Sequence, residues 1–203
     1  MITPLKAVVF DVGNVLYDWD IRYLYSKLID TPADLEWFLA NVVTPNWHFQ
    51  HDEGRAAADT TSELTTAFPD HAELIAQYVP RWLETIPGPM PGMIELVDEL
   101  AAKDVPLYAI TNFSAEFWLR FMPTAPVFGH FRDIVVSGVE RMVKPSPEIY
   151  TLAMQRFGLA PGEAMFIDDR ADNVHAGEAV GLIGHIFDGE PGVRAALVAA
   201  GLL

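Results

Sequence analysis

Four short stretches carry the side chains that could do chemistry, and each ends or follows an apolar run typical of a buried strand. They are Asp11, Thr111-Asn112, Lys144 and Asp168-Asp169. A carboxylate such as Asp11 can attack phosphorus as a nucleophile and form an aspartyl-phosphate. Mg²⁺ held by carboxylates removes the repulsion between carboxylate and phosphate, and a lysine adds a further positive charge. Threonine hydroxyls and backbone N–H groups hold phosphoryl oxygens.

These residues are far apart in the chain, so the fold has to bring them together. Helical and strand-like segments alternate from residue 91 to the end. We therefore predict an α/β fold, a doubly wound parallel sheet with right-handed crossovers. Ligands of such folds bind at the carboxyl ends of the strands, where all four stretches lie. The strands are expected at residues 5–10, 105–110, 134–137, 164–167 and 183–187.

Residues 17–88 have a different pattern from the rest. Their apolar side chains recur at helical spacing and predict about four helices and no strand. A turn-rich Pro-Gly segment at 87–92 closes this region. We predict a core domain of residues 1–16 and 89–203, with a helical cap of residues 17–88 inserted after strand one. The cap would lie over the carboxyl edge of that strand and act as a lid.

Composition limits the possible partners. The 203 residues include 13 Lys and Arg and 28 Asp and Glu, a net charge of −15, which disfavours nucleic acid and anionic membrane surfaces. No apolar run approaches the ~18–20 residues of a membrane span. Met1 to Lys6 lack the pattern of a secretory signal, and cysteine is absent, so we expect a cytoplasmic protein. A monomer and a dimer both remain open.

The four stretches together resemble the motifs of the haloacid dehalogenase-like (HAD) hydrolase superfamily, in the same order and across essentially the whole chain. They read Phe10-Asp11-Val12-Gly13-Asn14-Val15-Leu16, Ile110-Thr111-Asn112, Val143-Lys144-Pro145 and Phe166-Ile167-Asp168-Asp169-Arg170-Ala171-Asp172-Asn173. The first and last motifs, with His51-Asp52-Glu53-Gly54, are most similar to a bacterial subgroup that includes α-glucose-1-phosphate phosphatases. The resemblance implies a Mg²⁺-dependent phosphomonoester hydrolase acting on a small phosphorylated metabolite such as a sugar phosphate.

The resemblance also implies roles for individual residues. Asp11 would be the nucleophile, and Thr111 and Lys144 would bind the phosphoryl group with Asn112 beside it. The implied Mg²⁺ ligands are Asp11, the carbonyl of Gly13 and Asp169, with Asp168 reaching the metal through water or holding its shell. Asn173 would brace the loop after the fourth motif.

Gly13 departs from the superfamily pattern, in which an aspartate usually protonates the leaving oxygen at this position. Losing a general acid typically costs ~10²–10⁴ in rate. A substrate with a good leaving group, such as an anomeric phosphate, needs this acid less. Alternatively, another group supplies the proton; the candidates are Asp18, Asp20, Asp52, Glu53 and a cap histidine.

Two other functions fit the same residues. A 2-haloacid dehalogenase uses the same nucleophile on carbon, but it needs no metal and gains nothing from Asp168 and Asp169 beside Asp11. A phospho-ligand binding protein without catalytic activity would explain the missing acid at Gly13.

Several side chains have both a structural and a functional interpretation. His48 and His51 are expected to line the substrate pocket rather than to bind a second metal. Trp19 and Trp47 could stack on a sugar ring, although packing is the commoner use of tryptophan in a small lid. Arg170 is expected at the rim of the site. Four aromatic residues are expected in the core, namely Tyr17, Trp37, Phe38 and Trp82.

Overall fold

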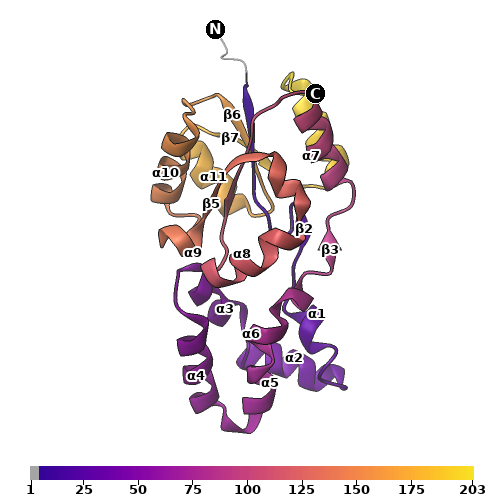
Figure 1. Cartoon of the computed structure of the whole chain (residues 1–203), viewed down its shortest axis with the longest axis vertical. Helices are drawn as coiled ribbons and strands as arrows, with labels where there is room; N and C mark the ends of the chain where they lie inside the picture. Colours follow the sequence, from indigo (N-terminus) through magenta and orange to yellow (C-terminus); the bar gives the residue numbers. More distant parts are fainter. Residues whose placement is uncertain (1–4) are drawn as a thin grey trace.

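The computed structural model describes residues 5–203, so residues 1–4, with which the expected core domain begins, lie outside the described part. Five parallel strands form one sheet in the order β5-β4-β1-β6-β7 (Figure 1). The central strands are buried on both faces, as their unbroken apolar sequences require. The strands are β1 (Ala7–Phe10), β4 (Leu107–Thr111), β5 (Phe131–Val136), β6 (Ala164–Asp168) and β7 (Ile183–Ile186).

Helices cover both faces of this sheet, which confirms the predicted α/β, doubly wound architecture. Alternate residues of β1 enter different cores: Val8 and Phe10 join the cluster with α7 (Met93–Ala102) and α12 (Glu190–Ala199). Ala7 and Val9 join the cluster with α10 (Pro147–Phe157), beside α11 (Ala171–Ala179). Between strands, α8 (Ala115–Phe121) and the short α9 (Ser137–Glu140) lie close to the carboxyl edge (Figure 1).

A helical layer lies below the carboxyl edge of the sheet in Figure 1. Its apolar side chains continue the core cluster of the sheet, with Leu24, Phe38 and Tyr78 completely or almost completely buried. In the described part of the chain, this layer contains six α-helices rather than about four. They are α1 (Arg22–Tyr25), α2 (Pro32–Asn41), α3 (Pro45–Asp52), α4 (Ala57–Ala67), α5 (Ala72–Ala76) and α6 (Tyr78–Arg81). Four short 3₁₀ turns complete the chain, at Pro69–His71, Trp82–Thr85, Met122–Thr124 and Pro126–His130.

The expectation of no strand in residues 17–88 is wrong at both ends of that region. Tyr17–Asp18 (β2) and Gly88–Pro89 (β3) pair as an antiparallel ribbon. Two residues per strand carry no detectable alternation, so the sequence pattern could not reveal them. The ribbon holds together the two chain segments that lead into and out of the helical layer.

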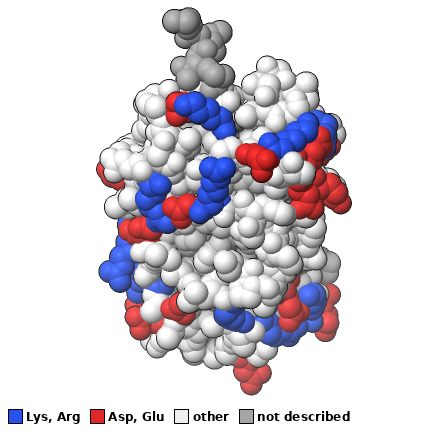
Figure 2. Space-filling model, turned by 45° about the horizontal axis from the view of Figure 1, so that its top comes forward, with Lys and Arg blue, Asp and Glu red and all other residues white. Residues whose placement is uncertain are grey.

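Charged side chains of both signs are mixed on one face of the molecule (Figure 2). Figure 2 shows a face on which basic and acidic side chains are interspersed rather than gathered in a basic patch. Arg156, for example, contacts Asp133 at 2.6 Å. Among residues 5–203, no helix combines the length and the apolar character needed to cross a membrane.

Candidate active site

Three adjacent strands bring the acidic and hydroxyl side chains to one edge. Asp11 follows β1, Thr111 ends β4 and Asp168 ends β6, and β1 lies between the other two strands. The backbone N–H of Asp11 donates to the carbonyl of Ile167 at 2.8 Å, which continues the β1–β6 ladder by one residue. Parallel strands therefore place these side chains together, as their sequence positions predicted.

Lys144 lies at the centre of this group. Its Nζ is 2.9 Å from Asp11 Oδ1 and 2.6 Å from Asp168 Oδ2, and the residue is 1% exposed. Burial alone would lower the pKa of Lys144, but the two carboxylates outweigh burial and raise it. The ammonium group therefore stays charged, as a buried cation does only when it is paired.

Burial has the opposite effect on Asp11. It raises the pKa of this carboxyl group to about 7, because the opposing effect of Lys144 is smaller and because Asp168 and Asp169 add negative charge. Without further positive charge, the carboxyl group of Asp11 is partly protonated near neutral pH. An added cation would favour the ionised form, which is the nucleophilic one.

Two asparagines fix the loops around Lys144. Asn173 Nδ2 donates to both oxygens of Asp168, at 3.0 and 3.2 Å. The amide of Asn112 donates to the carbonyl of Lys144 at 2.9 Å and accepts from its N–H at 2.8 Å. Both polar ends of Asn112 are thus used on backbone. This arrangement favours a positioning role for Asn112 over the substrate contact expected from its sequence position.

Two features leave unsatisfied hydrogen-bonding capacity and negative charge in this cluster. Thr111 is 1% exposed, and its Oγ1 has no hydrogen-bond partner among the described residues. Asp11, Asp168 and Asp169 each offer an oxygen within 4.8 Å of the others. The three carboxylates face one ammonium group, so the cluster has excess negative charge. Carboxylate oxygens suit Mg²⁺, which binds to proteins through few carboxylates and keeps some of its water ligands. The exposed carboxylate of Asp169 leaves access for that water.

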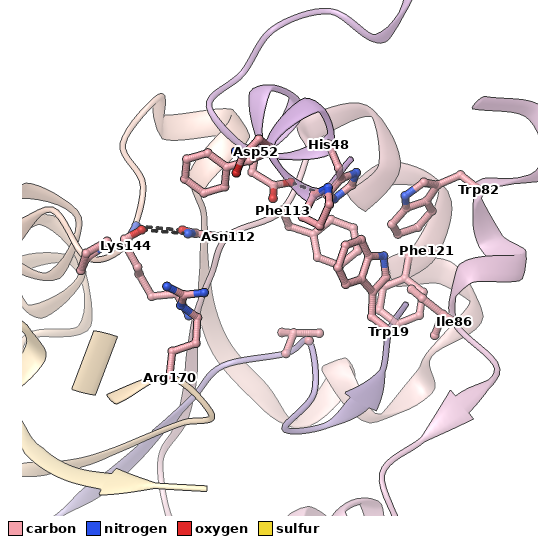
Figure 3. A pocket seen from close by; sticks show the side chains of 16 residues that line it. Trp19, His48, Asp52, Trp82, Ile86, Asn112, Phe113, Phe121, Lys144 and Arg170 are labelled. Carbon is pink, nitrogen blue, oxygen red and sulfur yellow. Dashed lines mark hydrogen bonds and ion pairs between the residues drawn. The ribbon is translucent and has the colours of Figure 1, made fainter. Parts of the chain in front are cut away.

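A cavity of about 410 Å³ opens beside this cluster (Figure 3). Lys144, Asn112 and Arg170 lie at one end of it, and aromatic side chains including Trp19 and Phe121 lie at the other. The lining residues come from both the sheet edge and the helical layer: Val12, Gly13, Trp19, Pro45, Asn46, His48, Phe49, Asp52, Trp82, Ile86, Asn112, Phe113, Phe121, Lys144, Pro145 and Arg170. A ligand here would contact both layers.

Several sequence expectations for this cavity differ from its actual lining. His48 lines it, but His51 is fully buried and bonds to Thr60 Oγ1 at 2.7 Å. Trp19 lines it, whereas Trp47 donates from Nε1 to the carbonyl of Thr60 at 3.2 Å inside the helical layer. The histidine pair therefore does not form one wall of the pocket.

The aromatic end of the cavity was missed by sequence reasoning. Trp82, expected in the core, is 1% exposed and lines the cavity, together with Phe113 and Phe121. Trp37, also expected in the core, is 48% exposed. Aromatic residues at helical spacing predict burial, but the pattern does not say whether they face a core, a cavity or solvent.

The sheet, its acidic carboxyl edge and the helical layer define an α/β protein with a candidate acidic site at the strand ends. A family model for haloacid dehalogenase-like hydrolases matches residues 5–181. The chain belongs to this family.

Two relatives of similar sequence are phosphatases. A sesquiterpene phosphatase of Aspergillus oryzae is 28% identical over 192 residues, which is 93% of each chain. A phosphoglycolate phosphatase of Thiobacillus denitrificans is 24% identical over 88% of this chain and 81% of its own. The chain is therefore a hydrolase of the phosphatase type, which argues against the alternative of a binding protein without catalysis.

Solved structures share the fold. An HAD family enzyme of Bacteroides thetaiotaomicron superposes with a TM-score of 0.75 at 19% identity, covering 96% of this chain and 99% of its own. The same enzyme has been solved in complex with magnesium and inorganic phosphate (TM-score 0.69, 20% identity, 91% and 95% coverage). An L-2-haloacid dehalogenase of Xanthobacter autotrophicus superposes with a TM-score of 0.63 at 18% identity, covering 98% and 84%.

Proposed function

We propose that this protein is a Mg²⁺-dependent phosphomonoester hydrolase with Asp11 as its nucleophile. One observation carries the proposal: Lys144 Nζ contacts Asp11 and Asp168 within 2.9 Å, beside a third carboxylate, Asp169. A nucleophilic carboxylate, a fixed ammonium group and oxygen ligands for a cation suit attack on a phosphate dianion.

Each residue has a defined part in this proposal. Asp11 attacks phosphorus in line, the ester P–O bond breaks, and water later cleaves the aspartyl-phosphate. Lys144 binds a phosphoryl oxygen and keeps Asp11 oriented, and the free hydroxyl of Thr111 donates to another phosphoryl oxygen. Asn112 and Asn173 hold Lys144 and Asp168 in place.

The metal would be held by Asp11, Asp169 and the backbone carbonyl of Gly13, with Asp168 behind them. When bound, Mg²⁺ supplies the positive charge that offsets the excess of carboxylates and the incoming phosphate. A Bacteroides enzyme of similar fold has been solved with magnesium and inorganic phosphate, which is consistent with Mg²⁺ as the cation.

The cavity suggests an apolar alcohol as the leaving group instead of the sugar expected from sequence. Nine of its lining residues are aliphatic, aromatic or proline side chains, and both polar ends of Asn112 are already bonded. A volume of about 410 Å³ suits a small organic ligand. The similarity to a sesquiterpene phosphatase supports the same substrate class, a phosphomonoester of a terpenoid-sized alcohol.

Dehalogenation is the competing activity, because a dehalogenase has the same fold. The carboxylate of a 2-haloacid would meet Asp168 and Asp169 beside Asp11, and like charges at that distance repel. A phosphate dianion would be repelled at least as strongly, but the proposed Mg²⁺ would offset its charge, whereas a dehalogenase needs no metal and gains nothing from these carboxylates.

A panel of phosphomonoesters with apolar and polar alcohols, assayed with Mg²⁺ and with chelator, tests the proposal. We expect Mg²⁺-dependent phosphate release that is fastest for apolar esters and abolished by Asp11→Asn. Chloride release from 2-chloropropionate that is insensitive to chelator would contradict it.

A further inference from the structure

We infer that Asp52, from the helical layer, is the general acid and base that replaces the missing carboxyl group at Gly13. This assignment rests on the proposed phosphatase function and adds a catalytic residue to it. Asp52 is the last residue of α3, and its side chain lines the cavity.

Asp52 lines the cavity between its phosphoryl-binding end and its aromatic end (Figure 3). A bound ester would keep its phosphoryl group near Lys144 and its apolar alcohol among the aromatic side chains. The bridging oxygen, which must receive a proton, then lies between the two ends. Figure 3 shows Asp52 beside His48, between Lys144 and the aromatic end that includes Trp82.

Asp52 has a carboxylate oxygen without a hydrogen-bond partner among the described residues. The residue is 6% exposed, and the oxygen is Oδ1. The nearest basic atom, His48 Nε2, lies 3.6 Å away, beyond hydrogen-bond distance. A buried polar atom without a partner is costly unless a ligand or water satisfies it, so this buried oxygen still has a hydrogen bond to make.

The surroundings of Asp52 favour its protonated form. Burial is the largest cause that raises the pKa of Asp52 well above its ordinary value. The hydrogen bond from the backbone N–H of Ser114 and the charge of Lys144 lower this pKa, and the negative charges of Asp11 and Glu53 raise it. His48 gives no compensating charge, because burial lowers its pKa to about 3. A carboxyl group whose pKa is raised holds its proton more firmly and can donate it to a leaving oxygen.

The other candidate acids are committed or outside the cavity. Asp18 accepts from the hydroxyl of Tyr23 at 2.6 Å, and Asp20 accepts from the backbone N–H of Arg22 at 2.7 Å. Glu53 is exposed to solvent and does not line the cavity. His48 is neutral, and its Nδ1 is bonded to the hydroxyl of Tyr78 at 2.5 Å.

The proton balance is complete with Asp52 alone. As Asp11 bonds to phosphorus and the ester P–O bond breaks, the carboxyl proton of Asp52 moves to the leaving oxygen and gives a neutral alcohol. Water then attacks the aspartyl-phosphate, and the Asp52 carboxylate takes a proton from that water. Inorganic phosphate leaves, and both aspartates return to their starting states.

Two esters of similar size and apolarity test this assignment. 4-Nitrophenyl phosphate has a good leaving group and benzyl phosphate a poor one. In Asp52→Asn, we expect benzyl phosphate hydrolysis to fall by ~10²–10⁴. With 4-nitrophenyl phosphate, we expect a burst of about one nitrophenolate per enzyme, followed by slow turnover, because only the hydrolysis of the intermediate still needs the base. Glu53→Gln, one residue away and exposed, should retain wild-type rates.

Two further variants guard against a folding defect. Asp52→Ser repeats the test with a smaller side chain. A side chain added at Gly13 would meet nothing within 4 Å, and this residue lines the same cavity. Gly13→Asp combined with Asp52→Asn should therefore recover benzyl phosphate hydrolysis at least tenfold, whereas Gly13→Asn in the same background should recover none.

The outcomes separate the two proposals. Equal losses on both esters, with no burst, would overturn the role of Asp52 and leave a structural one. Full benzyl phosphate activity in Asp52→Asn would overturn it too. Failure of the wild-type protein to release phosphate from any ester would instead overturn the proposed function.

Discussion

Lys144 Nζ lies 2.9 Å from Asp11 Oδ1 in a site where the lysine is 1% exposed. Because the same ammonium group also contacts Asp168 at 2.6 Å, its position is fixed from two sides. The proposed nucleophile and the proposed phosphoryl-binding cation are therefore one preorganised unit. Changes to either residue should affect chemistry more than substrate binding.

Replacing Lys144 by methionine tests this unit. The variant leaves the buried carboxylates of Asp11 and Asp168 without their cation, so we expect kcat to fall by ~10³ or more. The free energy of unfolding should fall by ~3–5 kcal/mol, measured by urea denaturation near pH 7. Lys27→Met, at a half-exposed lysine paired with Glu84, is the control and should change neither quantity much. Wild-type kcat in Lys144→Met would contradict the role of Lys144.

The metal site can be tested without an assay of turnover. Mg²⁺ that binds only the folded state should raise the melting temperature of the wild-type protein. Asp169→Asn should largely remove that rise and increase the Mg²⁺ concentration needed for half-maximal activity at least tenfold, because Asp169 is an exposed carboxylate of the cluster. Asp172→Asn, also exposed nearby, is the matched control and should behave as wild type. An unchanged Mg²⁺ response in Asp169→Asn would rule out this ligand.

Buried His48 should make folding sensitive to acid. Its pKa is lowered, chiefly by burial and then by the neighbouring His51, to about 3 in the folded state, against about 6.5 for an unperturbed histidine. Above pH 6.5 the imidazole is neutral in both states and adds no pH dependence. Between pH 6.5 and 3 only the unfolded state binds the proton, so stability falls by about 1.4 kcal/mol per pH unit as the pH falls.

The effect of His48 on stability has to be separated from that of Asp52, because the raised pKa of Asp52 makes stability rise as the pH falls. The variant His48→Gln separates the two effects. We expect the stability difference between wild type and His48→Gln to shrink by ~2 kcal/mol from pH 6.5 to pH 5, measured by urea denaturation. A difference that does not change with pH would show that His48 titrates normally in the folded protein.

The aromatic end of the cavity should determine substrate preference. Trp19 packs on His48 with ring centroids 4.7 Å apart and lines the cavity. Trp19→Ala should lower kcat/KM for a farnesyl-sized phosphate by ~10–100-fold, since it removes apolar contact worth ~1.5–3 kcal/mol. For a short alkyl phosphate the loss should stay within about threefold. Equal losses for both substrates would argue against an apolar leaving-group pocket.

The sequence predicted the strands correctly where an apolar segment is buried on both faces of the sheet and an aspartate stands at its end. The strands ending near Asp11 and Asp168 could be predicted because their apolar segments are unbroken and because each leads into carboxylates that can act as a nucleophile or bind a metal. Their adjacency then follows from parallel topology. The short ribbon of Tyr17–Asp18 and Gly88–Pro89 was not predictable, because its pairing depends on contacts distant in sequence.

The residues that line the cavity could not be predicted from the sequence pattern as the strands were. Trp82 and Trp37 were both expected in the core, yet Trp82 is buried against the cavity and Trp37 is 48% exposed. Only the packing of the helical layer on the sheet edge decides which aromatic side chains face a ligand. For the same reason, the sequence left five kinds of candidate for the missing acid, whereas the geometry favours Asp52.

In the proposed mechanism, Asp11 attacks phosphorus and carries the phosphoryl group as an aspartyl-phosphate. Rapid quench in acid during turnover of 4-nitrophenyl phosphate, followed by peptide mass spectrometry, tests it most directly, ideally with Asp52→Asn to accumulate the intermediate. We expect the mass of one phosphoryl group on the peptide that contains Asp11, and none in Asp11→Asn. Phosphate release by the wild-type protein with no phosphoryl group on that peptide, or with full activity in Asp11→Asn, would contradict the account.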